Sequence, residues 1–318
     1  MPFILSLDEG TTSARAALYD REARRIALAS VPTVSHFPHP GWVEQDATLI
    51  WESQLQAARN TLGLSGFGPG DVSAIGITNQ RETTVVWDKA TGKPVAPAIV
   101  WQCRRTAARC RELQAHAAKI TRKSGLVVDA YFSGTKIEWI LDNVEGARAK
   151  AANGDLLFGN IDTWLIWNLT GGRVHVTDPT NASRTMLYNI NNTSWDQELF
   201  ELFGIPVWAL PEVVPSAGHI AKTSGLKFLP DGIPVTGILG DQQAALFGQA
   251  CFEPGMVKAT YGTGAFVLAQ YGTDVPPLAE GLVTTAAWDL GAFGPASYAY
   301  EGSAFVAGAA IQWLRDEL

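Results

Sequence analysis

The chain has 318 residues, of which 47% are hydrophobic and 17% are charged, and its formal net charge is −7. This composition is typical of a packed globular protein, excludes a disordered or fibrous chain, and at this length favours two domains. The acidic balance, without a basic stripe, excludes a nucleic-acid binder, because phosphate contacts along a nucleic acid require clustered Lys and Arg.

The N-terminal segment and the cysteines indicate the compartment. The opening residues MPFILSLDEG lack a basic segment and reach an acidic pair too early for a secretory signal. No apolar stretch approaches the roughly 20 residues that a membrane helix requires. The three cysteines lack CxxC spacing and nearby histidines, which favours reduced thiols. We therefore expect a cytoplasmic protein without membrane insertion.

The first third of the chain alternates short apolar runs with turn-forming residues. Three consecutive strands of a meander are predicted over 3–7, 14–19 and 25–30. A helix over 47–62 follows, with Asp46 as its N-cap. An apolar strand over 72–78 is expected inside the sheet, and residues 83–95 predict a hairpin around the turn DKATGK.

Strands and helices alternate in the rest of the chain, which predicts an α/β fold. A helix is predicted over 105–118, and the polar, Asn/Thr-rich stretch 170–194 is interpreted as an insertion over the sheet. Residues 232–250 predict a strand, a polar turn and a helix. Residues 301–318 predict a helix that stops without a capping glycine, as in a truncated chain.

A weak internal repeat suggests where the domains meet. Residues 255–272 predict a strand, a turn with Gly262, Thr263 and Gly264, and a second strand, which repeats the pattern around residues 8–13. We therefore predict one domain over 1–250 and an incomplete second domain over 251–318.

The segment 8–13 carries groups suited to a phosphate. Three consecutive hydroxyl residues and the backbone N–H groups can face an anion, and Arg15 adds a positive charge. The hydroxyl residues are Thr11, Thr12 and Ser13. A carboxylate beside a phosphate is repulsive unless a divalent cation lies between them, so Asp8 implies Mg²⁺. An ordinary hairpin rich in turn-forming residues is the alternative.

Further polar residues stand at predicted strand ends, where ligands collect in α/β folds. Arg81 and Glu82 offer a donor fork and an acceptor for vicinal hydroxyls, or else form a surface ion pair. Trp101 offers an apolar wall for a carbon chain, or fills the core. Asp241, where a helix begins, can accept a hydroxyl proton as general base, or cap the helix.

Taken together, these segments resemble the FGGY carbohydrate kinase family, and within it the kinases of glycerol. The motifs are LDEGTTSARA, ITNQRETTVVWD, AIVWQCRRT, YFSGTKIEWIL, GILGDQQAALFGQ, TYGTGAF and EGSAFVAGAAIQWLRDE. They span essentially the whole chain. The resemblance implies a sugar kinase/Hsp70/actin-like (ribonuclease H-like) fold, with a complete N-terminal domain and the first part of a second such domain. It also implies ATP-dependent, Mg²⁺-assisted phosphorylation of glycerol to sn-glycerol 3-phosphate.

The resemblance assigns site residues by their match to the family's motifs. It implies a glycerol site at Arg81, Glu82, Trp101, Tyr131, Asp241 and Gln242, with Asp241 as the base. It implies an ATP site at Thr11, Thr12, Ser13, Arg15, Thr263, Gly308 and Gln312, with Asp8 on the magnesium side. Glu9 departs from the glutamine common in the family, and we expect its carboxyl group to point away from the phosphates.

Two alternatives stay open at this point. One is a related FGGY kinase that acts on another polyol or on a ketose. The other is a polyol-binding chain without kinase activity, because the family continues well past residue 318 and the remainder supplies half of the ATP cleft. The implied partners are glycerol and ATP/ADP, and the full-length protein is expected to form a homo-oligomer.

Overall fold

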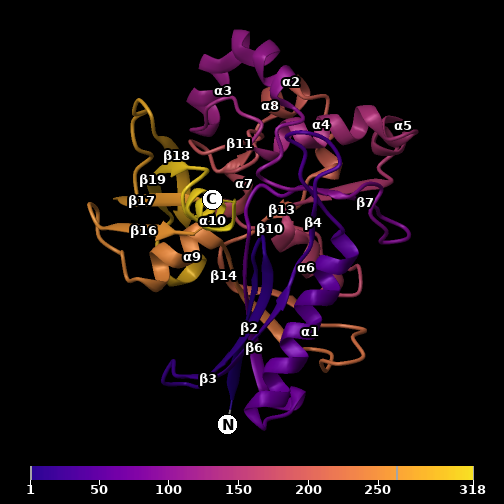
Figure 1. Ribbon diagram of the computed structural model, residues 1–318, viewed down its shortest axis with the longest axis vertical. Coiled ribbons are helices and arrows are strands. Elements are labelled where there is room, and N and C mark those ends of the chain that lie inside the picture. Colours follow the sequence, from indigo (N-terminus) through magenta and orange to yellow (C-terminus); the bar gives the residue numbers. More distant parts are fainter. Residues whose placement is uncertain (1, 263, 318) are drawn as a thin grey trace.

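The computed structural model describes residues 2–262 and 264–317, which form an elongated α/β molecule built around two sheets (Figure 1). The larger sheet has six strands in the order β14-β15-β6-β1-β2-β3. These strands are β1 (Phe3–Glu9), β2 (Ser13–Tyr19), β3 (Arg25–Pro32), β6 (Val72–Asn79), β14 (Ala217–Lys222) and β15 (Pro234–Gly240). Strands β1, β6 and β15 run parallel, so their carboxyl ends meet at one edge. The predicted meander and the interior strand are confirmed.

The long helix α1 (Ala47–Ser65) packs across β2 and β3. Its start is as predicted, and its end lies three residues beyond the predicted residue 62. The carboxylate of Asp46 accepts hydrogen bonds from the backbone N–H groups of Thr48 and Leu49, which supplies the N-cap. Gly66 ends the helix with a φ of 76°, a left-handed conformation that a residue without a Cβ adopts freely.

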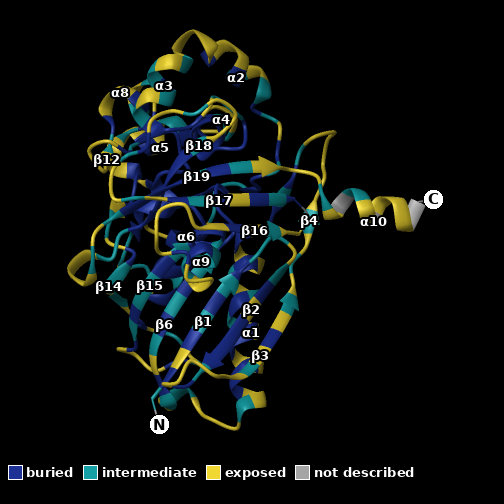
Figure 2. Cartoon of the chain, turned by 90° about the vertical axis from the view of Figure 1, so that its left-hand side faces the viewer, coloured by how far each residue is buried: buried dark blue, intermediate teal, exposed yellow. Residues whose placement is uncertain are grey.

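The second sheet has four strands in the order β16-β17-β19-β18 and begins after helix α9 (Asp241–Gly248). Its strands are β16 (Val257–Tyr261), β17 (Ala265–Gly272), β18 (Val283–Trp288) and β19 (Ser297–Ala304). The two strands of the predicted strand-turn-strand are confirmed as β16 and β17, and Thr263 of its turn lies outside the described residues. The helix predicted over 301–318 is wrong in its first third, because β19 continues to Ala304 and α10 (Gly308–Glu317) begins only afterwards. Figure 2 shows α10 extending away from the two sheets.

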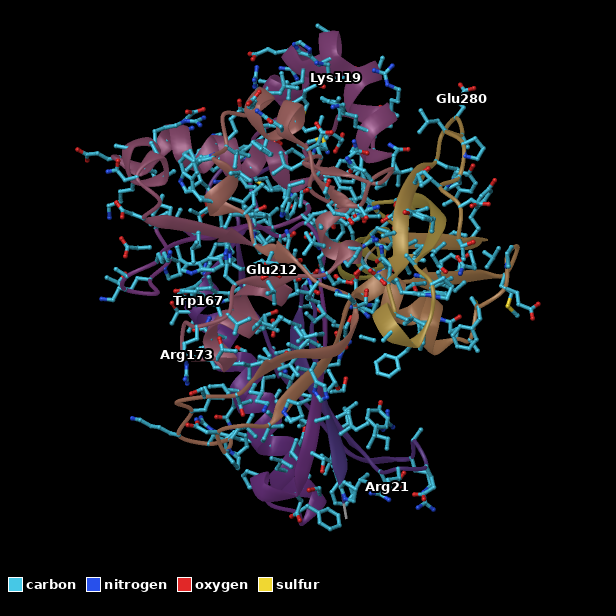
Figure 3. The ribbon with its side chains drawn as sticks, turned by 180° about the vertical axis from the view of Figure 1, so that it is seen from behind. Arg21, Lys119, Trp167, Arg173, Glu212 and Glu280 are labelled. Atoms are coloured by element: carbon cyan, nitrogen blue, oxygen red, sulfur yellow. The ribbon has the colours of Figure 1, made fainter. Side chains whose placement is uncertain are left out.

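A group of short helices covers one end of the molecule. Figure 3 labels Lys119 among these helices and Arg21, in the β2–β3 connection, at the opposite end of the molecule. The helices at this end are α2 (Ala107–Glu112), α3 (Ala117–Ser124), α4 (Ser133–Asn143), α5 (Ala147–Ala152) and α8 (Gln197–Leu202). Helix α6 (Ile161–Leu169) contacts α1 and the six-stranded sheet instead, and α7 (Pro179–Ala182) contacts β15 and β18. Short 3₁₀ turns lie at Pro69–Asp71, Leu113–His116, Val207–Ala209 and Gly291–Phe293.

The remaining strands are short. They are β4 (Ser35–His36), β5 (Glu44–Gln45), β7 (Val85–Asp88), β8 (Ala98–Ile99), β9 (Leu156–Gly159), β10 (Val176–Thr177), β11 (Tyr188–Asn189), β12 (Ser194–Trp195) and β13 (Glu212–Val213). The hairpin predicted over 83–95 is confirmed around its turn, where Trp87 pairs with Pro94 and the N–H of Val95 donates to the Val86 carbonyl at 2.9 Å. The prediction missed that β7 also pairs along its length with the distant β9. The helix predicted over 105–118 is broken by a 3₁₀ turn.

The stretch 170–194 is not an exposed insertion. Residues 176–188 are all buried, and they include the charged side chains of Asp178 and Arg184. Several polar side chains there are hydrogen-bonded inside the protein, as when Asp178 accepts from Thr180 and Ser216. Polarity in this segment therefore marks a buried hydrogen-bonded layer. Among the helices of residues 2–262 and 264–317, none has the length and apolar content needed to cross a membrane.

Candidate active site

A cavity of about 470 Å³ lies where the carboxyl-terminal ends of β1, β6 and β15 face the second sheet. Most of the residues predicted for a site line it together: Asp8, Thr11, Thr12, Arg15, Arg81, Glu82, Trp101, Tyr131, Asp241 and Gln242. Ser13 lies in β2, and Gly308 begins α10 with its N–H bonded to the Gly262 carbonyl; neither lines the cavity. Thr263 and the side chain of Gln312 lie outside the described residues.

The turn between β1 and β2 forms one end of the cavity and is held by its backbone. The N–H of Gly10 donates to the Ser13 carbonyl at 3.1 Å, and a Cβ added to Gly10 would lie only 3.1 Å from that oxygen. The carbonyl of Thr11 accepts from the amide of Gln45 at 2.7 Å. The Thr11 hydroxyl accepts from the indole N–H of Trp101 at 2.8 Å. This hydrogen bond joins the turn that is predicted to meet ATP to Trp101, which is predicted to meet glycerol.

Asp8 and Arg15 face each other across β1 and β2 beside this turn. Their side chains are 33% and 49% exposed, and Nη1 of Arg15 lies 3.3 Å from Oδ2 of Asp8. Burial raises the pKa of Asp8, although Arg15 opposes the rise. No cluster of three or more metal-ligating side chains occurs in the described part of the chain. A single carboxylate fits Mg²⁺, which keeps several waters and takes other ligands from phosphate oxygens.

Glu9 points away from the cavity, as expected. Its side chain lies on the buried face of β1 with Leu5 and Leu7, opposite to the face of Asp8. Neither carboxyl oxygen has a hydrogen-bond partner among the described residues. Burial, with a contribution from the Asp8 charge, raises the pKa of Glu9 well above its ordinary value.

Arg81 and Glu82 follow directly after β6 and are almost fully buried. Their exposed fractions are 2% and 1%, which rules out the surface ion pair. Glu82 has a φ of 59°, in the left-handed region that is uncommon for residues other than glycine. A Cβ on Gly240 would lie 2.7 Å from Cγ of Arg81, so a glycine is required where β15 passes this side chain.

Two residues that were not predicted complete a buried ionic network around this pair. Glu301 of β19 lies 2.5 Å from Nη1 of Arg81 and accepts from Nη2 of Arg184 at 2.8 Å. Arg184 in turn donates from Nε to Glu82 at 2.6 Å. Burial acts to raise the pKa of Glu301, but Arg184 and Arg81 outweigh it and lower the pKa to about 2. The network ties the two sheets together at the cavity.

Asp241 lies at the mouth of the cavity as the first residue of α9. Gly240 occupies the N-cap position, so Asp241 does not cap the helix. Its Oδ1 accepts from the backbone N–H of Gln242 at 2.7 Å and lies 3.3 Å from Nε of Arg81. The side chain remains 37% exposed. Burial raises its pKa, although the Arg81 charge opposes the rise. An accessible carboxylate with a raised pKa suits a proton acceptor.

Three aromatic side chains form an apolar wall beside these polar groups. Trp101 packs edge-on against Tyr131 and against Phe266 of β17, with ring centroids 5.8 Å apart in both pairs. Phe266 was not predicted. The Tyr131 hydroxyl accepts from Arg81 at 3.3 Å. One side of the cavity is thus apolar and the other carries hydrogen-bonding groups, which matches a short carbon chain with hydroxyls.

Comparison with known proteins finds that this chain is similar to carbohydrate kinases. Residues 3–248 match the N-terminal domain of the FGGY family of carbohydrate kinases. The glycerol kinase of Carboxydothermus hydrogenoformans is 58% identical over 318 residues, which cover 99% of this chain and 63% of that protein. Glycerol kinase 2 of Thermotoga maritima is 56% identical over 320 residues, covering 100% and 64%.

Solved structures agree with these sequence matches. The crystal structure of Plasmodium falciparum glycerol kinase with ADP superposes with a TM-score of 0.91 at 36% identity, covering 99% of this chain and 63% of that chain. The xylulose kinase of Rhodospirillum rubrum, at 23% identity, has a TM-score of 0.85 over 98% and 62% of the two chains and shows the same fold. The chain thus spans somewhat under two thirds of these relatives, and the predicted fold class is confirmed.

Proposed function

This chain belongs to the FGGY family of carbohydrate kinases, and from that premise we propose that it carries the polyol site and the base of a glycerol kinase. The reaction transfers the terminal phosphoryl group of ATP to glycerol and yields sn-glycerol 3-phosphate and ADP. One observation carries this proposal: a single cavity holds the Asp241 carboxylate, the Arg81–Glu82 pair and the β1–β2 turn. The similarity to proteins named glycerol kinase supports it.

Glycerol would lie between the polar and the aromatic sides of the cavity. Arg81 and Glu82 supply donors and an acceptor for adjacent hydroxyls, and their buried ion pairs hold them in place before any ligand arrives. The apolar C–H groups would pack on Trp101 and Phe266, while Tyr131 and Gln242 border the same space. Such preorganisation lowers the entropy lost on binding.

Asp241 would act as the general base. Its exposed carboxylate would accept the proton of a terminal hydroxyl while that oxygen forms a bond to the terminal phosphorus and the bond from phosphorus to the ADP oxygen breaks. Arg81, 3.3 Å from Oδ1, opposes the rise in the pKa of Asp241 and so favours the ionised carboxylate. At the end of this step, Asp241 would hold the proton and glycerol would carry the phosphoryl group.

The β1–β2 turn would bind the phosphates of ATP. Thr11, Thr12 and Ser13 supply hydroxyls and N–H groups, and Arg15 supplies a positive charge. Asp8 would help to hold Mg²⁺, which neutralises phosphate charge when bound. We place Thr263, Gly308 and Gln312 along the nucleotide, as the family resemblance implies. The ADP in a structure with a TM-score of 0.91 supports nucleotide use.

The rest of the proposal concerns the protein's surroundings. Three free, buried cysteines support a cytoplasmic location. A homo-oligomer of the full-length protein rests on the family resemblance alone. A different polyol or a ketose as substrate is the second candidate, because a xylulose kinase shares the fold.

Calorimetric titration of this chain with glycerol and then with Mg-ATP, followed by a coupled assay of ADP release, tests the proposal. Micromolar to millimolar glycerol binding with glycerol-dependent ADP release is the expected result. Stronger binding of xylulose than of glycerol would replace the substrate. Glycerol binding without nucleotide binding or turnover would leave a polyol-binding chain and would overturn the kinase assignment for this chain.

A further inference from the structure

A buried lysine stands behind the cavity on the second sheet. Lys258 of β16 is 1% exposed, and its Nζ donates to Oε1 of Gln242 and, at 3.0 Å, to the hydroxyl of Thr260. Within residues 2–262 and 264–317, no carboxylate forms an ion pair with it. A buried ammonium group that is hydrogen-bonded only to neutral acceptors is costly, because burial removes its hydration and no directly paired carboxylate replaces it.

The contact with Lys258 determines how the Gln242 amide is turned. An ammonium group has three donors and no acceptor, so only the carbonyl oxygen of the amide can face it. The Nε2 group of Gln242 then faces Asp241 and donates to Oδ2 at 3.1 Å. The opposite orientation would set NH₂ against the ammonium group and a carbonyl against the carboxylate.

The amide in turn restrains the carboxylate proposed as the base. Oδ2 of Asp241 is held by the side chain of Gln242, while Oδ1 is held by the backbone N–H of Gln242 and faces Nε of Arg81. Loss of the Lys258 contact frees the amide to rotate and leaves Oδ2 without a fixed partner. Resting on the proposed function, we propose that Lys258 is a positioning residue of the kinase, which orients the Asp241 carboxylate through Gln242.

The position of Lys258 in the fold gives this contact a second role. Strand β16 ends next to Gly262, which lines the cavity together with Thr260, the residue that Lys258 also contacts. The same ammonium group therefore joins the strand that ends at the cavity to the helix that carries the base. A shift of β16 toward or away from the cavity moves the Gln242 amide with it.

Raising the pH removes the charge of Lys258, so the contact between Lys258 and Gln242 can be followed by titration. Burial and the charge of Arg81 together lower the pKa of Lys258 to about 8, against the opposing effects of Glu301, Asp241 and Cys251. Above that pH, the neutral amine holds the amide oxygen less strongly. The side-chain amide of Gln242 should therefore report the titration of Lys258.

The primary test is nuclear magnetic resonance of ¹⁵N-glutamine-labelled protein, with the Gln242 side-chain amide assigned from its absence in Gln242→Glu. In the native chain, we expect its shift to follow one titration near pH 8. Lys258→Met, which removes the charge but keeps the volume, should abolish that titration. Lys258→Arg should keep the low-pH shift throughout, because a guanidinium group stays charged. The adjacent Val257, 55% exposed, gives the control Val257→Ala with an unchanged titration.

Turnover is the second readout. Lys258→Met should lower kcat by about 10- to 100-fold, since small misplacements of a catalytic group have effects of that size, while the KM for glycerol changes less than about threefold. Lys258→Arg should recover part of the loss. An amide titration that persists in Lys258→Met, or a native kcat in that variant, would overturn the inference. A native chain that neither binds glycerol nor releases ADP refutes the proposed function, and the amide titration still decides the Lys258 contact.

Discussion

The two ends of the cavity are built in different ways. At the polyol end, Arg81, Glu82, Arg184 and Glu301 are all buried and joined by ion pairs. At the phosphate end, the described ion pair joins Asp8 and Arg15, whose side chains are 33% and 49% exposed, and its separation is longer, at 3.3 Å.

The difference shows where the ligand itself must contribute. The polyol end has donors and acceptors fixed by protein charges, so a neutral ligand can bind without compensating them. At the phosphate end, Asp8 partly neutralises the charge of Arg15. A phosphate therefore gains the full attraction of Arg15 only when a cation neutralises the Asp8 carboxylate. Substitutions at the polyol end should therefore change how firmly the binding groups are held, and substitutions at the phosphate end should change the charge that a phosphate meets.

The largest effect is expected at Asp241, where the two ends meet. Asp241→Asn removes the proton acceptor but keeps the shape, so kcat should fall by about 10²- to 10⁴-fold while glycerol affinity stays within a few-fold. The coupled ADP assay and calorimetry measure the two quantities. The exposed Asp274→Asn is the matched control. Turnover close to native in Asp241→Asn would remove the base from the mechanism.

The rigid end is tested by Glu301→Gln. The substitution leaves the charges of Arg81 and Arg184 without their shared partner, and the free energy of unfolding should fall by about 3 to 5 kcal/mol in urea denaturation. The matched control is Asp129→Asn, which opens a fork-shaped but exposed pair with Arg104 and should cost at most about 1 kcal/mol. Equal losses in both variants would contradict the contrast in burial.

The charge-dependent end is tested by Arg15→Gln. Affinity for Mg-ATP should fall by about tenfold, the effect of losing one partly exposed charged hydrogen bond, while glycerol affinity stays unchanged. Added salt should weaken nucleotide binding by the native chain more than by the variant, since it screens a charge that the variant lacks. Calorimetry at low and high KCl measures both. A parallel loss of glycerol affinity would mean that the two ends are not built separately.

The smallest effect is a change in the pH dependence of stability through Glu9. Because its pKa is raised on folding, its stabilising contribution is full below the ordinary pKa of 4.5 and is lost as pH rises through the folded value. Glu9→Gln should remove this decline and stabilise the chain by about 1 to 3 kcal/mol at pH 8. Urea denaturation between pH 5 and 8, about the range in which most domains stay folded, tests this. Exposed Glu22→Gln should show the native decline.

Local sequence signals predicted much of the fold. Asp46 and Gly66 delimit α1, and alternating apolar residues define β1 and β2, since these signals act within a few residues. The turn signal at 83–95 predicted the local hairpin but not the pairing of the buried β7 with β9, about 70 residues away, because a turn carries no information on such a distant partner.

The site was predicted where residues stand next to each other in the sequence. Arg81 with Glu82 and Asp241 with Gln242 could be found in this way, together with the motifs of the family. Glu301 could not be found, because it lies 220 residues from Arg81 and its segment resembles the start of a helix. A charged residue followed by small residues is compatible with a helix and with a strand. The segment at Glu301 is a strand because it pairs with β17.

The hydrogen bond between Trp101 and Thr11 has a thermodynamic consequence. The indole forms the wall against which glycerol would lie, and the hydroxyl belongs to the turn that would meet ATP, so the two ligands share one bonded pair of side chains. If either ligand alters that bond, its binding changes the affinity for the other, and the factor must be the same in both directions. The order in which the two substrates bind then affects the rate of assembly but not the stability of the ternary complex.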